Sequence, residues 1–263
     1  CLNAMLRDFE RGQNLTELKA TLQQELLNGV DPGKKLVCSW ESLGNSSPGR
    51  HRERLERIKT VFGASRLMIG LRNPLTQIPS EYLQNIEGKF LKGRRKWMGK
   101  DSYISLGEWF DRRINKKTDD DSSLEGVFPY ARNIQTSIEL LGKENVGVFL
   151  FEDLVKDADL YYQRICEFVG IDPVEGVQLT KSVHKNKRTS LAQLEYIQSL
   201  NKSPWLNSLM KVVGRRMRRK MFNLQAGDGK PAKVSLPPQL EKKIIQATQS
   251  GNRWIAEELN LPL

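Results

Sequence analysis

A run of five apolar residues, Leu67–Leu71, constrains the fold of this chain more than any other stretch. It shows no alternation of apolar and polar positions, which is the pattern of a strand buried on both faces of a parallel sheet. Pro74 removes a backbone donor and biases Asn73 towards extended geometry, so we expect this strand to end there and a helix to follow from about Ile78. Arg72 is therefore predicted at the carboxyl end of an interior strand.

Two further apolar runs, residues 35–40 and 145–151, predict neighbouring strands. Strands that alternate with helical crossovers of this length indicate an α/β fold, a parallel sheet with helices on both faces. No Gly/Ser-rich or Pro-rich linker is present, so we expect a single domain over residues 1–263. Helices are expected at residues 2–28, 51–62, 106–113, 129–141 and 152–169, with a basic amphipathic helix at 205–222, inside the basic segment 205–225.

The formal charge of +11 implies an anionic partner, which could be a nucleotide, an acidic glycan, a nucleic acid or a membrane surface. Nothing in the chain has the aromatic and basic spacing of a nucleic-acid module, so we expect no nucleic-acid partner. The 205–222 helix could lie on a membrane or an acidic polymer, or pack on the domain. No apolar run reaches the roughly 18 residues of a membrane-spanning helix, and no signal peptide is recognised. We expect a cytoplasmic protein, with peripheral membrane contact through that helix as the alternative.

The cysteines and aspartates do not predict a metal site. Cys1, Cys38 and Cys166 form no metal or redox motif, and Cys38 and Cys166 are interpreted as buried thiols in a reducing compartment. The consecutive aspartates at 119–121 point in different directions and are interpreted as a surface turn. We therefore expect no metal cofactor.

Arg72 and Ser80 are the candidate anion-binding pair. Ser80 is expected in the first turn of the helix that follows the strand, where backbone N–H groups and the helix dipole favour an anion. The alternative is a loop arginine paired with a carboxylate and a solvated helix serine.

An Arg followed eight positions later by Ser, through Asn-Pro and into a helix, resembles the 3′-phosphate signature of sulfotransferases that use 3′-phosphoadenosine-5′-phosphosulfate (PAPS). The segments Phe-Leu-Phe-Glu-Asp-Leu at 149–154 and Ile-Cys-Glu-Phe-Val-Gly-Ile-Asp at 165–172, and the closing helix at 252–259, resemble bacterial, carbohydrate-sulfotransferase-like members and follow in family order. The resemblance covers residues 36–190 and the tail. It implies a P-loop-like sheet, PAPS or its product PAP as co-substrate, Arg72 and Ser80 on the 3′-phosphate, and Phe151 in the nucleotide site.

Two basic loops are further candidates. Residues 89–100 could form a lid over an anionic ligand, with Arg94, Arg95, Lys96 and Trp97 as substrate-binding residues, or a solvated loop. The resemblance assigns Lys187 and Arg188 to a loop that closes over the nucleotide; the alternative is a loop before a helix capped by Thr189 or Ser190.

One signature of the family is absent from the given sequence: the Lys-x-Gly-Thr-Thr type loop, which holds the 5′-phosphosulfate in family members. Because the chain begins at Cys1 in a helical pattern, we expect this loop upstream; the alternative is a degenerate, non-catalytic member that binds a nucleotide or polyanion. Sulfuryl transfer also needs a base. The candidate is Glu41, after the second expected strand, with a structural carboxylate as the alternative. His51 and His184 are weaker candidates, interpreted as surface residues.

These features predict a sulfotransferase that acts on a hydroxyl or amine of a small-molecule or glycan acceptor whose identity the sequence leaves open. A P-loop kinase would need a Gly-rich Lys loop that is absent from the given sequence. A basic binding protein without enzymatic activity is the competing class.

Overall fold

The computed structural model describes residues 15–22, 24, 28, 31, 34–39, 41–44, 46–63, 65–92, 103–115, 127–181, 189–203, 205, 212–227 and 229–262. This part of the chain is mostly helical, with a small parallel sheet, and belongs to the α/β class in that broad sense. Contacts divide the chain into two compact units, the first from residues 1–71, 128–149 and 251–263 and the second from 72–127 and 150–250. The single domain over residues 1–263 stays a prediction.

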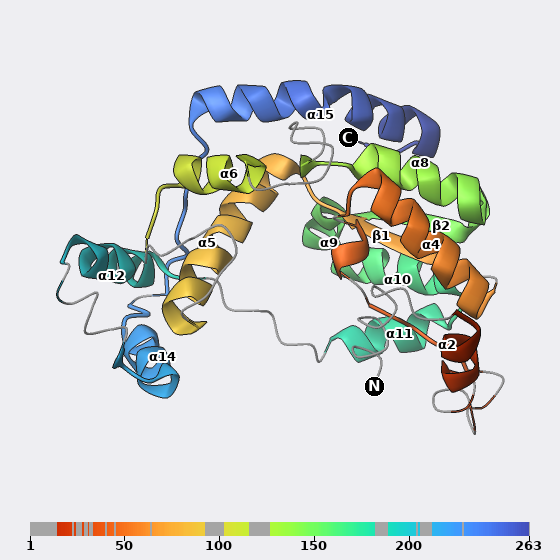
Figure 1. The fold of residues 1–263 in the computed structure, drawn as a ribbon, viewed down its shortest axis with the longest axis horizontal. Coiled ribbons are helices and arrows are strands. Elements are labelled where there is room, and N and C mark those ends of the chain that lie inside the picture. The colour runs from red at the N-terminus through yellow and green to blue at the C-terminus, as the bar shows by residue number, and fades with distance from the viewer. Residues whose placement is uncertain are drawn as a thin grey trace. The chain divides into compact units, whose positions relative to one another are not determined.

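The sheet pairs β1 (Leu67–Leu71) with β2 (Val146–Leu150), and the two strands run parallel (Figure 1). Two of the three predicted strands are therefore confirmed. In β1 the end residue Leu71 is buried, whereas Met68 and Gly70 are exposed. Since β1 has one strand neighbour among the described residues and an exposed face, its predicted interior position, buried on both faces, is wrong.

The third predicted strand, at 35–40, is also wrong. Residues 35–39 have no regular secondary structure and are all exposed, with Val37 68% accessible. A short apolar run becomes a strand only where a neighbouring strand pairs with it and a packed face covers it. Among the described residues, no strand pairs with 35–39 and no packed face covers them. Cys38 is accordingly exposed, contrary to the prediction, whereas Cys166 is buried as predicted.

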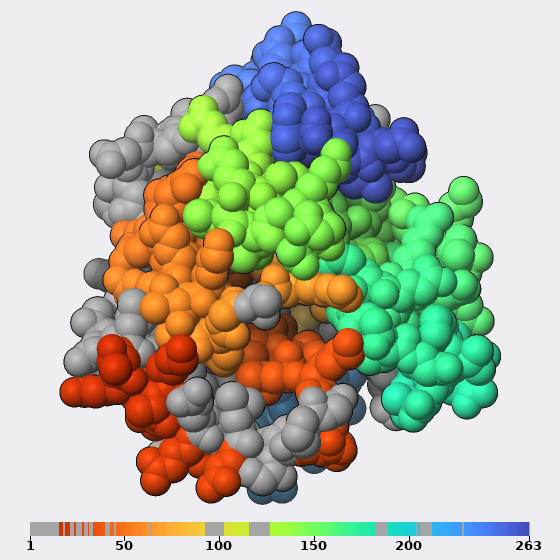
Figure 2. Space-filling model, turned by 90° about the vertical axis from the view of Figure 1, so that its right-hand side faces the viewer, coloured from red at the N-terminus to blue at the C-terminus, as the bar shows by residue number. Residues whose placement is uncertain are grey.

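In the first unit α4 (Pro48–Phe62) packs against α8 (Tyr130–Leu141). On the face in Figure 2 the two helices, orange and green, lie next to each other, and the blue end of the last helix lies beside α8. Their buried side chains follow helical spacing, as in His51 and Leu55 of α4 and in Asn133 and Ser137 of α8. The α8 helix ends as predicted at Gly142, whose φ of 88° suits glycine. The unit also holds α2 (Leu15–Leu22), α3 (Glu41–Gly44) and the 3-10 helix η2 (Lys143–Asn145).

The second unit is built on α5 (Pro74–Lys92), which packs against α6 (Leu106–Asn115) and a basic helix, α14 (Arg215–Leu224). Tyr82 of α5 lies edge-on to Trp109 of α6, with ring centroids 5.9 Å apart, and its hydroxyl donates to the backbone oxygen of Ile104 at 2.7 Å. Both rings are fully buried. This aromatic pair fixes the face of α5 that points away from the candidate site. The same unit holds α9 (Phe151–Lys156), α10 (Ala158–Val169), α11 (Pro173–Thr180) and α12 (Leu191–Lys202), and the long last helix is α15 (Pro238–Leu259).

Two predicted helices are interrupted in the structure. The helix expected at 152–169 is divided at Asp157, which caps α10 by accepting a hydrogen bond from the backbone N–H of Leu160. The basic helix expected at 205–222 is not continuous, because Val213 and Gly214 are not helical and α14 starts at Arg215. Glycine is a poor helix former and stands here at the N-cap, where no side chain is needed.

Candidate anion-binding site

The candidate site begins where the two strands end. Arg72 directly follows β1, and Phe151 directly follows β2. Because carboxyl ends of neighbouring parallel strands meet at one edge of a sheet, the two side chains are brought together. The guanidinium carbon of Arg72 lies 4.5 Å from the centroid of the Phe151 ring, which is a cation–π contact. The structure thus places two of the predicted site residues side by side.

Thr76 fixes the direction of the Arg72 side chain. Arg72 Nε donates to Thr76 Oγ1 at 3.2 Å, and Arg72 Nη2 donates to the Thr76 backbone oxygen at 3.1 Å. The Thr76 hydroxyl donates its own hydrogen to the backbone oxygen of Asn73 at 3.0 Å. With the Phe151 ring on one face and Thr76 at one edge, the guanidinium is held on the first turn of α5.

The start of α5 corrects the prediction for Ser80. The helix begins at Pro74, not near Ile78, because proline at the first helical position needs no hydrogen-bond partner. Asn73 caps it: its side-chain oxygen accepts from the Leu75 N–H at 2.9 Å, and its backbone oxygen accepts from the N–H groups of residues 76 and 77. Ser80 therefore lies in the second turn. The expected site with amide donors of the first helical turn next to Ser80 is wrong.

Ser80 nevertheless lies on the same face of α5 as Thr76. Residues four apart on a helix are stacked one above the other, separated by a rise of about 6 Å. Arg72 reaches Thr76, so Arg72, Thr76 and Ser80 form one line along the helix, which is called the Arg–Thr–Ser line below. Ser80 is half-buried, and within the described part of the chain its hydroxyl makes no hydrogen bond. Thr76 was missed from the sequence, although its spacing of four from both predicted residues was a usable signal.

The acidic residues at the start of α9 are bound to neighbouring groups. Glu152 Oε1 accepts a hydrogen bond from the backbone N–H of Asn73 at 3.0 Å, and Asp153 lies 3.6 Å from Arg164. Glu152 thereby ties the end of β2 to the end of β1. Acidic side chains in a first helical turn are also stabilised by the helix dipole.

His51 is not the surface residue that was predicted. It lies in α4 and is fully buried, with Nδ1 3.0 Å from the backbone oxygen of Leu43 and Nε2 2.8 Å from Ser137 Oγ. Because a carbonyl oxygen only accepts, Nδ1 carries a proton. Burial lowers the pKa of His51, partly offset by its hydrogen bonds, so the neutral ring is favoured. These contacts give His51 a structural role between α4 and α8.

Several predicted site residues cannot be placed. Glu41 opens α3, but its side chain is outside the described structure. The described residues also do not include Arg94, Arg95, Lys96, Trp97, His184, Lys187 and Arg188, nor the aspartates at 119–121. Ser190 is described, and it forms a capping box with Gln193 at the start of α12, which confirms the capping alternative for that residue.

No cluster of three or more His, Cys, Asp or Glu residues that could hold a metal ion occurs in the described ranges. Over the same ranges, no helix is long and apolar enough to cross a membrane. No family model matches the chain, and neither a curated protein nor a solved structure shows significant similarity to it.

Proposed function

We propose that this protein is a sulfotransferase that moves a sulfuryl group from PAPS to a hydroxyl or amine of an acceptor, with glycans as one acceptor class. The observation that supports the proposal best is the Arg–Thr–Ser line at the carboxyl end of β1. Ligands of open α/β sheets bind at this edge. The finer fold, a P-loop-like parallel sheet with helices on both faces, is part of the same proposal.

In this proposal the line holds the 3′-phosphate of the nucleotide. A guanidinium is a planar fork of donors that matches the geometry of a phosphate, and it stays charged at all physiological pH values. Ser80, one turn above Thr76, supplies a hydroxyl donor for another phosphate oxygen. Thr76 already accepts from Arg72 and donates to Asn73, so it acts as a positioning residue. Phe151 acts on the nucleotide site through Arg72, whose guanidinium its ring supports.

The chemical step needs a base for the acceptor proton and positive charge at the transferring group. Glu41 remains the proposed base, although the strand expected before it is not formed over residues 35–39. Lys187 and Arg188 remain proposed contacts to the nucleotide. Arg94, Arg95, Lys96 and Trp97 remain proposed contacts to the acceptor. PAPS would supply the activated sulfuryl group.

The test compares two nucleotides by calorimetry. We expect 3′-phosphoadenosine 5′-phosphate to bind more tightly than adenosine 5′-phosphate, and Arg72→Ala to cost about 1.5 to 3 kcal/mol for the first nucleotide only, the scale of a hydrogen bond to a charged group. Arg66→Ala is the matched control, because this exposed arginine precedes the same strand at its other end. Equal affinity for the two nucleotides would refute the phosphate assignment. Specific binding without sulfuryl transfer, by a chain that includes the loop expected upstream, would instead support the non-catalytic alternative.

A further inference from the structure

Most of the excess positive charge lies in one segment. Residues 196–227 contain seven Lys or Arg and no Asp or Glu, against a net charge of +11 for the whole chain. Five of these seven are in α14, at residues 215, 216, 218, 219 and 220. A block of like charge repels itself, so it requires either solvent or an anionic partner.

The α14 helix is nevertheless firmly attached on its other side. Phe222 is buried, and its ring centroid lies 5.7 Å from that of Phe90 in α5. Arg218 Nη1 donates to the Phe90 backbone oxygen at 3.0 Å, and Gln193 Nε2 of α12 donates to the Phe222 backbone oxygen at 3.1 Å. The helix is thus held between α5 and α12, and its opposite face is presented outwards.

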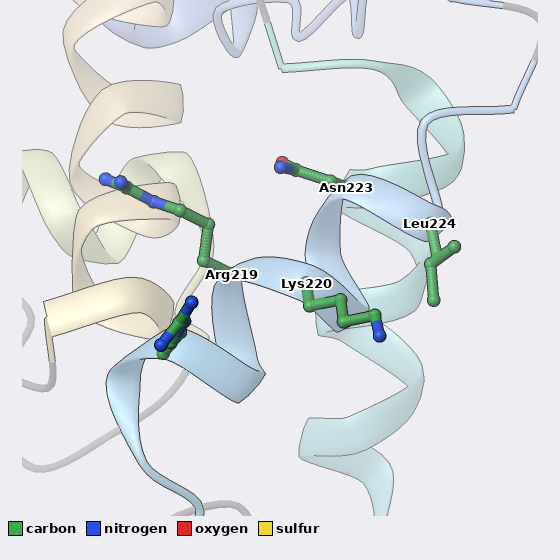
Figure 3. Close-up of a pocket in the computed structure, with 5 residues that line it drawn as sticks. Arg219, Lys220, Asn223 and Leu224 are labelled. Carbon is green, nitrogen blue, oxygen red and sulfur yellow. The ribbon is translucent and has the colours of Figure 1, made fainter.

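The cationic side chains on the outward face of α14 do not converge on one point. Arg216, Arg219, Lys220, Asn223 and Leu224 line a shallow, open pocket of about 380 Å³. Figure 3 shows Arg219 and Lys220 leaving the helix in different directions. A small anion would need donors that converge on one point, so the arrangement suits an extended anionic surface better.

Large apolar side chains are exposed among these charges. Met217 is 55% and Leu224 73% exposed, and because they are seven residues apart they lie on the same side of α14. Trp205 and Val212, in the preceding segment, are also exposed. Lys and Arg next to exposed Trp, Met and Leu are typical of helices that lie in a membrane interface, where the charges meet lipid headgroups and the apolar groups enter the acyl boundary.

We propose that α14 docks this protein onto the surface of an anionic lipid bilayer. Charge complementarity provides the attraction, and Met217 and Leu224 insert beside the headgroups. A soluble acidic polymer would bind the same Lys and Arg side chains of α14 but would leave Met217 and Leu224 in water. The docking is independent of the Arg–Thr–Ser line and does not require nucleotide.

The first experiment is flotation of the whole chain with vesicles of phosphatidylcholine alone or with about 30% phosphatidylserine, at roughly 0.1 M salt, where the Debye length is about 10 Å. We expect binding to the anionic vesicles only. The double variant Arg216→Gln/Lys220→Gln should bind about 30-fold more weakly, since each cation near such a surface contributes about 1 kcal/mol. Lys242→Gln/Lys243→Gln on α15 removes the same charge from another exposed site and should bind as the parent does.

The second variant, Met217→Ser/Leu224→Ser, separates a bilayer from an acidic polymer. It should lose at least about tenfold in vesicle affinity, from the lost apolar transfer, and keep its affinity for dextran sulfate. Both residues are mostly exposed, and unchanged circular dichroism melting will show that the variant is folded. Undiminished vesicle binding by this variant, or equal binding to neutral vesicles, would overturn the proposal.

Discussion

The ion pair between Glu81 and Arg113 joins α5 to α6 and offers a sharp test of how this unit is stabilised. Arg113 Nη1 lies 2.6 Å from Glu81 Oε2, and the two side chains are 10% and 30% exposed. The Arg113 guanidinium carbon also lies 5.6 Å from the centroid of the fully buried Trp109 ring. Glu81→Gln would leave a nearly buried cation without its counter-ion.

The expected cost follows from this burial. Removing one partner of a fully buried pair costs about 3 to 5 kcal/mol, whereas an exposed pair contributes about 0 to 1 kcal/mol. Arg113 is close to the first case and Glu81 is intermediate, so we expect Glu81→Gln to lower the free energy of unfolding by about 2 kcal/mol.

A second pair on α6 is the matched control. Arg112 and Glu108 are 2.6 Å apart, four residues apart on one helix, and 28% and 50% exposed. Glu108→Gln should cost no more than about 0.5 kcal/mol. Urea unfolding followed by tryptophan fluorescence measures both variants, and at about 1 M salt the Glu108 effect should vanish while that of Glu81 persists. Equal costs, or loss of both in salt, would refute the burial argument.

Three further predictions concern other sites. Because burial lowers the pKa of His51 from its ordinary value of 6.5, the unfolded chain binds more protons just below that pH, so stability should fall as the pH drops from about 6.5 towards the folded-state pKa; in His51→Asn this part of the pH dependence should be absent from unfolding curves. In Gly176→Ala the new methyl group would meet Cys166 Sγ and should cost about 1 to 3 kcal/mol of unfolding free energy, and adding Cys166→Ala should recover most of that loss. If Glu41 is the base, Glu41→Gln should lower turnover about 100-fold with unchanged nucleotide affinity, whereas a fall in melting temperature with normal turnover would identify a structural carboxylate.

Local signals in the sequence were sufficient to predict the two paired strands and most helix ends. The runs at 67–71 and 145–151 predict β1 and β2. The ends expected at 141 and 169 are where α8 and α10 end, each followed by a glycine with positive φ. Each depends on residues close together in the chain. The run at 35–40 has similar local content, but its described residues, 35–39, are exposed, because strand formation depends on a partner that the run itself does not encode.

The candidate site was predictable in its main residues and not in its geometry. Arg72 could be placed because it directly follows a predicted strand. Phe151 was expected in the nucleotide site only through the resemblance, and the run 145–151 placed it inside the strand rather than after it. The sequence predicts that Pro74 ends the strand; in the structure Pro74 also opens the helix, with Asn73 as the cap. This shift moved Ser80 from the first turn to the second. Burial of His51 was not predictable, since it depends on Ser137, 86 residues away in the chain.

The local connections suggest how the proposed site would be kept in shape. Glu152 holds the Asn73 backbone, Asn73 caps α5 and receives the Thr76 hydroxyl, and Thr76 directs Arg72. The hydrogen-bonded chain therefore runs from the end of β2 through the end of β1 to the guanidinium. An arginine held in this way loses little conformational entropy when an anion binds, so more of the interaction free energy is expressed as affinity. The same geometry explains why Thr76, which is not expected to contact the phosphate, should affect phosphate affinity through the orientation of Arg72.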